Sequence, residues 1–310
     1  MAILLAITDR DISQLQRELQ EHLQGTCEVW AYPDCPDPSR VEMAVLWKHP
    51  DDLLQKLPNL KLISSLGAGV EHILADGHRP AGVPITRVVD DMLIDSMRKY
   101  ILACVLSIHK RLPLFHRQQQ ESKWIKAMPP ELPLHIGFLG LGELGAPIAR
   151  SVATNGFEVW GYSRKPKEIK GVTCIHSGEE SLVEFVRRIN LLICLLPLTR
   201  ETEGILNYEL FRQMPAGSFL INAARGKHLV EEDLLRALDE GHIKEAFLDV
   251  FRQEPLPADH PFWSDPHIHI TPHIASVTQQ EMAAGVLAEN YLRLKKEQPL
   301  LYKVSARLGY

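Results

Sequence analysis

A glycine-rich segment, residues 140–145 (Gly-Leu-Gly-Glu-Leu-Gly), has the spacing of a phosphate-binding turn. It follows the apolar run 135–139 and precedes a stretch with Ile148, Ala149 and Val152 on one helical face. The first glycine permits a tight turn, the second lets the backbone approach a pyrophosphate, and the third lets helix pack on strand. The N–H groups at the start of the helix would bind the phosphates of a dinucleotide. A plain glycine turn is the alternative, and the flanking strand and helix favour the dinucleotide.

The end of the next predicted strand, residues 158–162, indicates the type of dinucleotide. An NAD site usually has an Asp or Glu about 20 residues after the glycines, where it accepts hydrogen bonds from the ribose 2′-OH. Ser163, Arg164 and Lys165 stand at that position here. Since a guanidinium binds a phosphate bidentately, these residues favour NADP(H), with NAD(H) as the alternative cofactor. An ordinary solvated basic turn is the competing interpretation.

Three polar segments that could do chemistry follow later strands of the same series. They are residues 222–226 (Asn-Ala-Ala-Arg-Gly), 249–256 (Asp-Val-Phe-Arg-Gln-Glu-Pro-Leu) and 271–275 (Thr-Pro-His-Ile-Ala). Open α/β sheets bind ligands outside the carboxyl ends of their strands, so one edge of the sheet would collect these side chains. A single Arg, Glu or His in a loop is usually a surface residue. All three in this order after a dinucleotide fingerprint indicate an active site.

The elements that position these segments alternate between strand-like and helix-like patterns, which predicts parallel sheets. The expected strands are 2–7, 44–47, 60–66, 85–89, 135–139, 158–162, 191–196, 218–222, 245–250 and 268–271. The expected helices are 11–23, 95–116, 144–154, 181–187, 231–240 and 279–297, with a Pro-broken connector at 117–133. The fold class is α/β, with two Rossmann/flavodoxin-like, doubly wound domains. The expected domains are residues 1–98, completed by about 290–310, and 99–289.

Composition excludes several classes of protein. The 310 residues carry 34 Lys and Arg against 39 Asp and Glu, a formal charge of −5, which argues against nucleic-acid or anionic-membrane partners. The uncharged, apolar stretches 100–109 and 190–199 have ten residues each, too few for a spanning helix. The five cysteines are scattered without a Cys-x-x-Cys pair, and no metal-ligand spacing occurs. A reduced, cytoplasmic enzyme without a metal is therefore expected.

The sequence resembles the D-isomer-specific 2-hydroxyacid dehydrogenases, and most of all their glyoxylate/hydroxypyruvate reductase A branch, over essentially the whole chain. Besides the segments above, the resemblance rests on five stretches. They are residues 45–48 (Val-Leu-Trp-Lys), 65–71 (Ser-Leu-Gly-Ala-Gly-Val-Glu), 160–164 (Trp-Gly-Tyr-Ser-Arg), 195–199 (Leu-Leu-Pro-Leu-Thr) with Thr202, and 306–310 (Ala-Arg-Leu-Gly-Tyr).

The resemblance implies NADPH-dependent reduction of small 2-oxo acids, glyoxylate to glycolate and hydroxypyruvate to D-glycerate. His273 would donate the proton to the carbonyl oxygen, because imidazole titrates near neutral pH. Glu254 would pair with it, favouring imidazolium and fixing the ring. Arg225 would bind the substrate carboxylate and polarise the carbonyl.

The resemblance also implies binding residues, with the substrate in a cleft between the domains that closes to assemble the site. The substrate would contact Trp47, Ala68, Gly69, Val70, Arg225 and His273. The N–H groups of Gly69 and Val70 would hold its carboxylate, and Trp47 would limit the pocket, although a core role is the usual one for a Trp. The cofactor would contact Gly140, Gly142, Glu143, Leu144, Gly145, Ser163, Arg164, Lys165, Leu196, Pro197, Thr202, Ala223, Ala224, Arg225, Asp249, His273 and Ala275. Asp249 would bind the nicotinamide carboxamide, with a structural cap as the alternative.

The same resemblance implies a homodimer in which Trp124 reaches toward the partner's site. One stretch, residues 90–100, departs from the pattern: it lacks a glycine common in relatives and has Lys99 where an acidic residue is usual. Within the class, the alternatives are a bulkier substrate such as phenylpyruvate, or NADH as cofactor. Formate dehydrogenase is disfavoured because that family has Gln where Glu254 stands. A non-catalytic dinucleotide-sensing protein is the alternative from another class.

Overall fold

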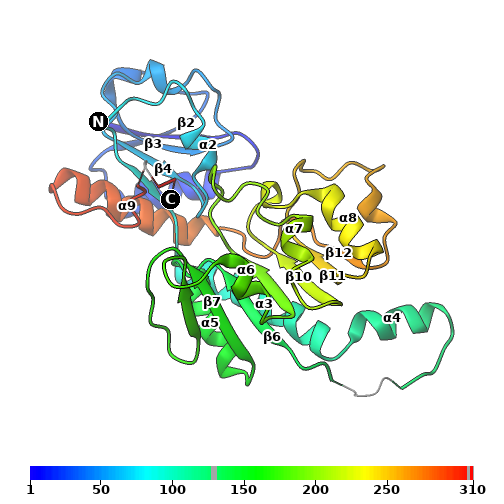
Figure 1. Ribbon diagram of the computed structural model, residues 1–310. Coiled ribbons are helices and arrows are strands. Elements are labelled where there is room, and N and C mark those ends of the chain that lie inside the picture. Colours follow the sequence, from blue (N-terminus) through cyan, green and yellow to red (C-terminus); the bar gives the residue numbers. More distant parts are fainter. Residues whose placement is uncertain (127–130, 306–307, 310) are drawn as a thin grey trace. The chain divides into compact units, whose positions relative to one another are not determined.

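The computed structural model describes residues 1–126, 131–305 and 308–309. The chain folds as two compact units, residues 1–93 with 277–310 (unit 1) and residues 94–276 (unit 2). Part of the predicted connector, 127–130, and three residues of the C-terminal segment, Ala306, Arg307 and Tyr310, lie outside the described residues. Each unit is an α/β layer structure (Figure 1).

Unit 1 has a five-stranded parallel sheet in the order β2-β1-β3-β4-β5. The strands are β1 (Ala2–Ile7), β2 (Glu28–Ala31), β3 (Val41–Trp47), β4 (Leu62–Ser65) and β5 (Ile85–Arg87). The helices are α1 (Ser13–Leu23), α2 (Glu71–Leu74) and α9 (Gln280–Lys295), with 3₁₀ turns at Pro38–Arg40 and Leu54–Lys56. Their apolar side chains bury both faces of the sheet, which explains why β1 and β3 are almost continuously apolar.

The C-terminal segment is part of unit 1. Helix α9 packs along α1, and the N–H of Val304 donates to the carbonyl of Ile85 at 2.8 Å. Thr86 and Lys303 form an antiparallel bridge beside it. The described part of the C-terminal segment therefore packs within unit 1.

Unit 2 has a seven-stranded parallel sheet in the order β12-β11-β10-β9-β6-β7-β8. The strands are β6 (His135–Leu139), β7 (Glu158–Ser163), β8 (Thr173–His176), β9 (Leu191–Cys194), β10 (Ser218–Asn222), β11 (Ile243–Leu248) and β12 (Ile268–Ile270). The helices are α3 (Asp91–His109), α4 (Leu112–Gln120), α5 (Gly145–Thr154), α6 (Leu182–Val186), α7 (Tyr208–Phe211) and α8 (Glu231–Asp239), with 3₁₀ turns at Gly226–His228 and Pro261–Trp263.

Two apolar cores lie on opposite faces of this sheet, one under α3 and α5 and the other under α6, α7 and α8. The strand order reverses between β6 and β9, and this switch point is where doubly wound sheets bind ligands. Two parallel-sheet α/β units confirm the predicted fold class.

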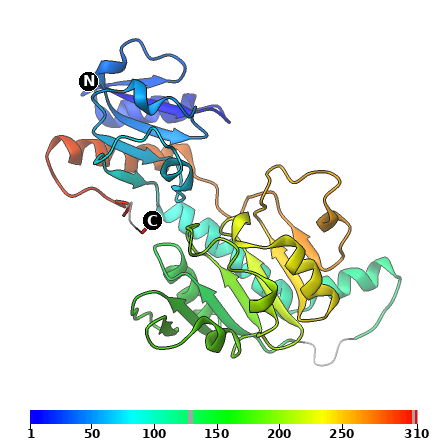
Figure 2. The same ribbon diagram turned by 45° about the horizontal axis from the view of Figure 1, so that its top comes forward.

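The predicted helix at 95–116 is wrong in one respect, because the chain breaks it at Arg111. This residue has a left-handed φ of 57°, which ends α3 and starts α4 in a new direction. Helix α4 extends away from the sheet of unit 2 in both ribbon views (Figures 1 and 2). Arg117, in the middle of α4, forms an ion pair with the buried carboxylate of Glu245, with a nitrogen–oxygen distance of 2.7 Å.

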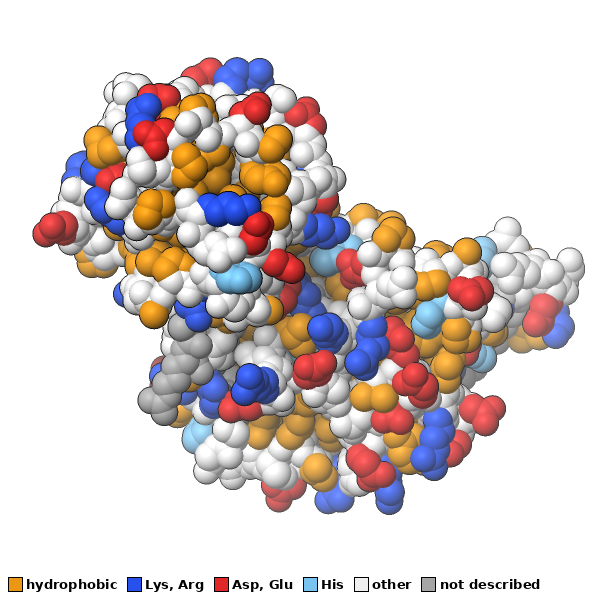
Figure 3. Space-filling model, turned by 90° about the horizontal axis from the view of Figure 1, so that it is seen from above, with side chains coloured by type: hydrophobic (Ala, Val, Ile, Leu, Met, Phe, Trp, Pro, Cys, Tyr) orange, Lys and Arg blue, Asp and Glu red, His pale blue; other side chains and the backbone are white. Residues whose placement is uncertain are grey.

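On the face drawn in Figure 3, side chains of both charge signs are interspersed over each unit. Across the described parts of the chain, no helix combines the length and the apolar character needed to cross a membrane.

Candidate active site

The glycine-rich segment 140–145 forms the turn between β6 and α5. A Cβ on Gly145 would lie 1.9 Å from the carbonyl oxygen of Gly140, so only glycine allows this packing of helix on strand. A Cβ on Gly142 would meet no heavy atom within 4 Å, so space is open in front of the helix. Among the described residues, the N–H groups of Glu143 and Leu144 have no hydrogen-bond partner. The turn therefore offers unpaired donors and open space at a helix start, which suits a pyrophosphate.

The predicted 2′-phosphate residues lie just past β7 in an exposed turn. The hydroxyl of Ser163 donates to the carbonyl of Lys165 at 2.7 Å and closes this turn. One guanidinium nitrogen of Arg164 lies 3.5 Å from a carboxylate oxygen of Glu201, in the loop after β9. Arg164 thus lies at the carboxyl edge of the sheet. Its assignment to a 2′-phosphate stays a prediction.

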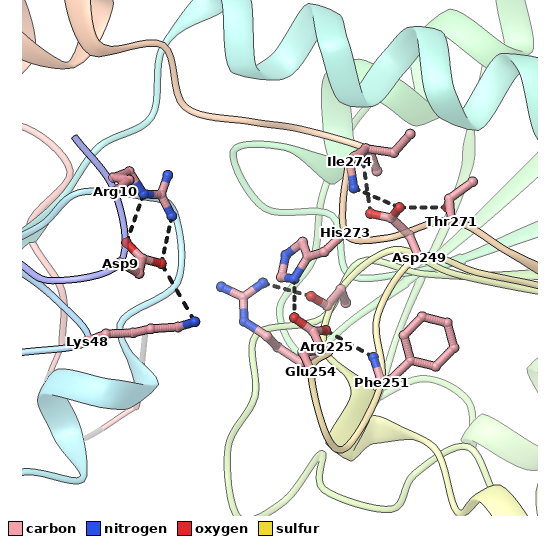
Figure 4. Close-up of polar contacts among 12 residues, drawn as sticks. Asp9, Arg10, Lys48, Arg225, Asp249, Phe251, Glu254, Thr271, His273 and Ile274 are labelled. Atoms are coloured by element: carbon pink, nitrogen blue, oxygen red, sulfur yellow. Dashed lines mark hydrogen bonds and ion pairs between the residues drawn. The ribbon is translucent and has the colours of Figure 1, made fainter. Parts of the chain in front are cut away.

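His273 and Glu254 form a hydrogen-bonded pair. Nδ1 of His273 lies 2.7 Å from Oε2 of Glu254, while the N–H of Phe251 donates to Oε1 at 3.0 Å (Figure 4). Burial would raise the pKa of the Glu254 carboxyl, but hydrogen bonds from His273 and Phe251 and the charges of His273 and Arg225 lower it below its usual value. The carboxylate therefore stays charged at neutral pH, orients the ring, and leaves Nε2 to act on a substrate.

Arg225 is placed beside this pair by a close contact of two backbones. A Cβ on Gly226 would lie 1.9 Å from the carbonyl carbon of Phe251, so glycine alone lets the loops after β10 and β11 touch. A guanidinium nitrogen of Arg225 donates to the carbonyl of Ala224 at 2.7 Å. The buried ring of His228 accepts from the Arg225 N–H at 3.3 Å, and its other nitrogen lies 3.3 Å from the carbonyl of Pro197.

Asp249 organises the turn that carries His273. Its buried carboxylate accepts hydrogen bonds from the hydroxyl of Thr271 at 2.7 Å and from the N–H groups of Ile274 and Ala275 at 2.9 Å. Its carbonyl accepts from the N–H of His273 at 2.9 Å. The alternative interpretation, a structural cap, thus has direct geometric support, while the nicotinamide contact stays a prediction.

His273 has a φ of 55°, which is uncommon for a residue other than glycine. The left-handed conformation costs about 1–2 kcal/mol. Such a conformation persists where the surroundings determine it strongly, and here the bonds to Asp249 do so.

The other predicted cofactor residues line the same edge of unit 2. The hydroxyl of Thr202 donates to the carbonyl of Pro197 at 2.7 Å and closes the loop that starts at Leu196 after β9. Ala223, Ala224 and Ala275 are buried, small side chains after β10 and β12. No described group of three or more His, Cys, Asp or Glu side chains could hold a metal ion.

The predicted substrate residues Trp47, Ala68, Gly69 and Val70 lie in unit 1, in the loops after β3 and β4. The hydroxyl of Ser65 donates to the carbonyl of Gly69 at 2.6 Å and accepts from the N–H of Gly67 at 3.3 Å. In the described structure the N–H groups of Gly69 and Val70 have no hydrogen-bond partner. The Trp47 ring packs edge-on against His72, with centroids 5.0 Å apart.

Four residues without a predicted role form hydrogen bonds that hold a predicted site segment: Ser65, His228, Thr271 and, on helix α3, Tyr100, whose hydroxyl lies 2.7 Å from that of Thr271. The signal for Tyr100 was available but weak: with Ser96 it makes a polar pair at i, i+4 on a helix that is otherwise apolar on its buried face.

Comparisons with known proteins agree with this geometry. Residues 102–275 match the family model of the D-isomer specific 2-hydroxyacid dehydrogenase NAD binding domain. The chain is 41% identical over 280 residues to the glyoxylate/hydroxypyruvate reductases A of Yersinia enterocolitica and Serratia proteamaculans, covering 88% of this chain and 89% of each relative.

Two solved structures are similar over the full chain. A D-isomer specific 2-hydroxyacid dehydrogenase from Xanthobacter autotrophicus Py2, in complex with NADPH and MES, has a TM-score of 0.94 and 38% identity, covering 100% of this chain and 99% of that one. The NADPH-dependent glyoxylate/hydroxypyruvate reductase of Sinorhizobium meliloti, in complex with NADP and sulfate, has a TM-score of 0.90 and 31% identity at the same coverage.

Proposed function

The chain belongs to the D-isomer-specific 2-hydroxyacid dehydrogenase family, and we propose that it reduces glyoxylate to glycolate and hydroxypyruvate to D-glycerate with NADPH. The observation that carries this proposal is the His273–Glu254 pair at 2.7 Å, with Arg225 in the adjoining loop, on a dinucleotide-binding sheet. A proton donor beside a carboxylate-binding cation is what a 2-oxo acid requires.

The proposed reaction divides its work among three side chains. Bound NADPH supplies a hydride, which adds to the carbonyl carbon while the C=O π electrons move to the oxygen. His273, protonated and held by Glu254, gives that oxygen its proton from Nε2. Arg225 binds the substrate carboxylate and stabilises the charge that develops on the carbonyl oxygen. The products are a 2-hydroxy acid and the oxidised cofactor.

The proposed NADPH site uses the loops at the carboxyl edge of unit 2. The open space before Gly142 and the N–H groups of Glu143 and Leu144 suit the pyrophosphate, and Ser163, Arg164 and Lys165 suit the 2′-phosphate. Changing Arg164 to Gln should raise KM for NADPH by about 10-fold or more and leave KM for NADH nearly unchanged, because a phosphate–guanidinium pair is lost. Equal effects on both cofactors would remove Arg164 from this role.

In unit 1, we propose that the N–H groups of Gly69 and Val70, beside Ala68, also bind the substrate carboxylate. Two adjacent N–H groups that lack partners suit an anion. Trp47 is proposed to limit the size of the substrate. Leu196, Pro197, Thr202, Ala223, Ala224, Asp249 and Ala275 are proposed to contact the cofactor.

We also propose a homodimer that works in the cytoplasm. Support for the dimer comes from exposed apolar side chains on and after the protruding helix α4: Trp124 is 96% exposed, Ile125 58% and Leu112 55%. Support for the cytoplasm comes from the five cysteines, all of which are free. Light scattering of the wild type and of Trp124→Ser tests the dimer, which the variant should weaken.

The experiment that tests the function compares kcat/KM for glyoxylate, hydroxypyruvate and phenylpyruvate, each with NADPH and with NADH. We expect NADPH with either of the two small acids to give the highest values. Preference for phenylpyruvate or NADH would retain the reaction and overturn the substrate or cofactor assignment. NADPH binding without turnover of any acid would favour a dinucleotide-sensing protein.

A further inference from the structure

A polar frame, defined as Ser96, Tyr100, Thr271 and Asp249, surrounds the turn that carries His273. Ser96 and Tyr100 are one helical turn apart on α3 and so share a face. The hydroxyl of Ser96 donates to the carbonyl of Ala275 at 3.2 Å, and the hydroxyl of Tyr100 lies 2.7 Å from that of Thr271. Helix α3 thus holds both ends of the segment 271–275.

The direction of the hydrogen bonds follows from the number of protons available. The Thr271 hydroxyl has one proton and donates it to Oδ1 of Asp249 at 2.7 Å. Tyr100 must therefore be the donor in its bond to Thr271. Burial raises the pKa of the Tyr100 hydroxyl above its usual value, so it keeps this proton. The result is a one-way chain from Tyr100 through Thr271 to the carboxylate of Asp249.

The same carboxylate holds the backbone on the far side of His273. Asp249 accepts from the N–H groups of Ile274 and Ala275, and its carbonyl accepts from the N–H of His273 (Figure 4). These hydrogen bonds stabilise the left-handed backbone conformation of His273. Loss of one hydroxyl from the chain would let the turn relax toward an ordinary conformation and move the ring away from its productive direction.

We propose that Tyr100 and Thr271 are positioning residues: through Asp249 they hold the strained turn that aims His273 at the substrate. The inference rests on the proposed function for the role of His273. Neither hydroxyl is assigned to the substrate or the cofactor.

Three substitutions separate the hydroxyl groups from the packing around them. Tyr100→Phe removes one oxygen, Thr271→Val removes the other at nearly constant volume, and Thr271→Ser keeps it. Tyr208→Phe is the matched control, because its hydroxyl also donates to a side-chain oxygen in unit 2, a carboxylate oxygen of Glu240, but at helices α7 and α8 rather than at the frame.

We expect kcat to fall about 10-fold in Tyr100→Phe and more in Thr271→Val, with KM for NADPH within about twofold of wild type. Thr271→Ser should restore kcat to within about threefold of wild type, and Tyr208→Phe should leave it unchanged. A rise in KM for NADPH at constant kcat would overturn the proposal, because it would show that the frame acts in cofactor binding. Equal loss in Thr271→Val and Thr271→Ser would overturn it in favour of packing.

Hydrogen exchange supplies a readout that does not depend on turnover. The amides of Ile274 and Ala275, held by Asp249, should exchange faster in Tyr100→Phe and Thr271→Val than in wild type and Tyr208→Phe. Unchanged exchange together with unchanged kcat would overturn the proposal. If the wild type reduces no 2-oxo acid, the proposed function fails, while exchange at these amides still decides whether the frame holds the turn.

Discussion

The two units present different chemical groups at the carboxyl ends of similar parallel sheets. In unit 2 the loops after β10, β11 and β12 carry the ionisable side chains Arg225, Glu254 and His273. In unit 1 the loop after β4 offers the backbone N–H groups of Gly69 and Val70. The first set can move a proton and stabilise developing charge, whereas the second set can only donate fixed hydrogen bonds.

The two loops are also held by different means. In unit 2, carboxylates hold the loops: Glu254 binds the ring of His273, and Asp249 binds the backbone N–H of Ala275. In unit 1, one serine hydroxyl, that of Ser65, bonds to both sides of the glycine loop. The difference suggests a division of labour between transition-state chemistry in unit 2 and substrate recognition in unit 1. Substitutions should therefore separate kcat effects from KM effects by unit.

The largest expected effect is that of His273→Gln in unit 2. Loss of the proposed proton donor should lower kcat about 100- to 10,000-fold, because general acid catalysis acts in the transition state. Substrate KM and the Kd for NADPH should change little. Stopped-flow absorbance of NADPH and fluorescence titration measure the two quantities. Near-full kcat of His273→Gln at neutral pH would contradict the proposed division of labour, since this side chain of unit 2 would then not take part in the chemical step.

The next effect in size is that of Glu254→Gln, which keeps the shape and removes the charge. We expect kcat to fall about 10- to 100-fold, because the amide orients the ring but does not stabilise its positive charge. The pKa of Glu254 lies below its ordinary value of 4.5, so the carboxylate acts at every pH above 4.5 and is lost only below it.

The wild type should therefore keep a higher kcat than Glu254→Gln from mildly acidic to neutral pH, since its carboxylate stays charged over this range. A pH–rate series on both proteins measures the two kcat values. Equal kcat values of the two proteins at neutral pH would show that the charge of Glu254 plays no part in the reaction.

Long central elements and ordered motifs made most of the fold and much of the candidate site predictable. The buried strands β1, β6 and β10 have the bounds that were predicted. Of the four edge strands, β5 and β12 were predicted, whereas β2 and β8, with four residues each, were missed. Edge strands depend on the sheet beside them more than on their own residues.

The frame around His273 was unpredictable for a different reason. Tyr100 and Thr271 are 171 positions apart, and neither has a motif of its own. The helical pattern predicts that Tyr100 faces the core but does not predict which loop it contacts. The left-handed φ of His273 depends on the contact between Tyr100 and the loop at Thr271. Sequence patterns thus predict the segments of the candidate site but not the residues that hold those segments in place.

A moderate effect tests unit 1. Ser65→Ala frees the glycine loop, so we expect substrate KM to rise about fivefold with kcat nearly unchanged, because ground-state and transition-state binding weaken alike. Ser64→Ala is the matched control: this neighbouring serine is equally buried, but its hydroxyl contacts the carbonyl of Ser65 at 3.4 Å and does not reach the loop. A fall in kcat at constant KM would place unit 1 in the chemical step and break the comparison.

The smallest effect sharpens the comparison at a loop of unit 2 that is proposed to recognise the cofactor. Glu201 is exposed and lies 3.5 Å from Arg164, so its carboxylate would compete with the proposed 2′-phosphate for the guanidinium. Glu201→Gln should raise the preference for NADPH over NADH about twofold at low ionic strength, since exposed ion pairs are weak. High salt should shrink the gain, because it screens the carboxylate. Glu203→Gln controls for net charge, because it removes the same charge from an exposed side chain two residues along. An equal gain in NADPH preference in both variants would mean that the effect comes from net charge and that Glu201 has no specific part in cofactor choice.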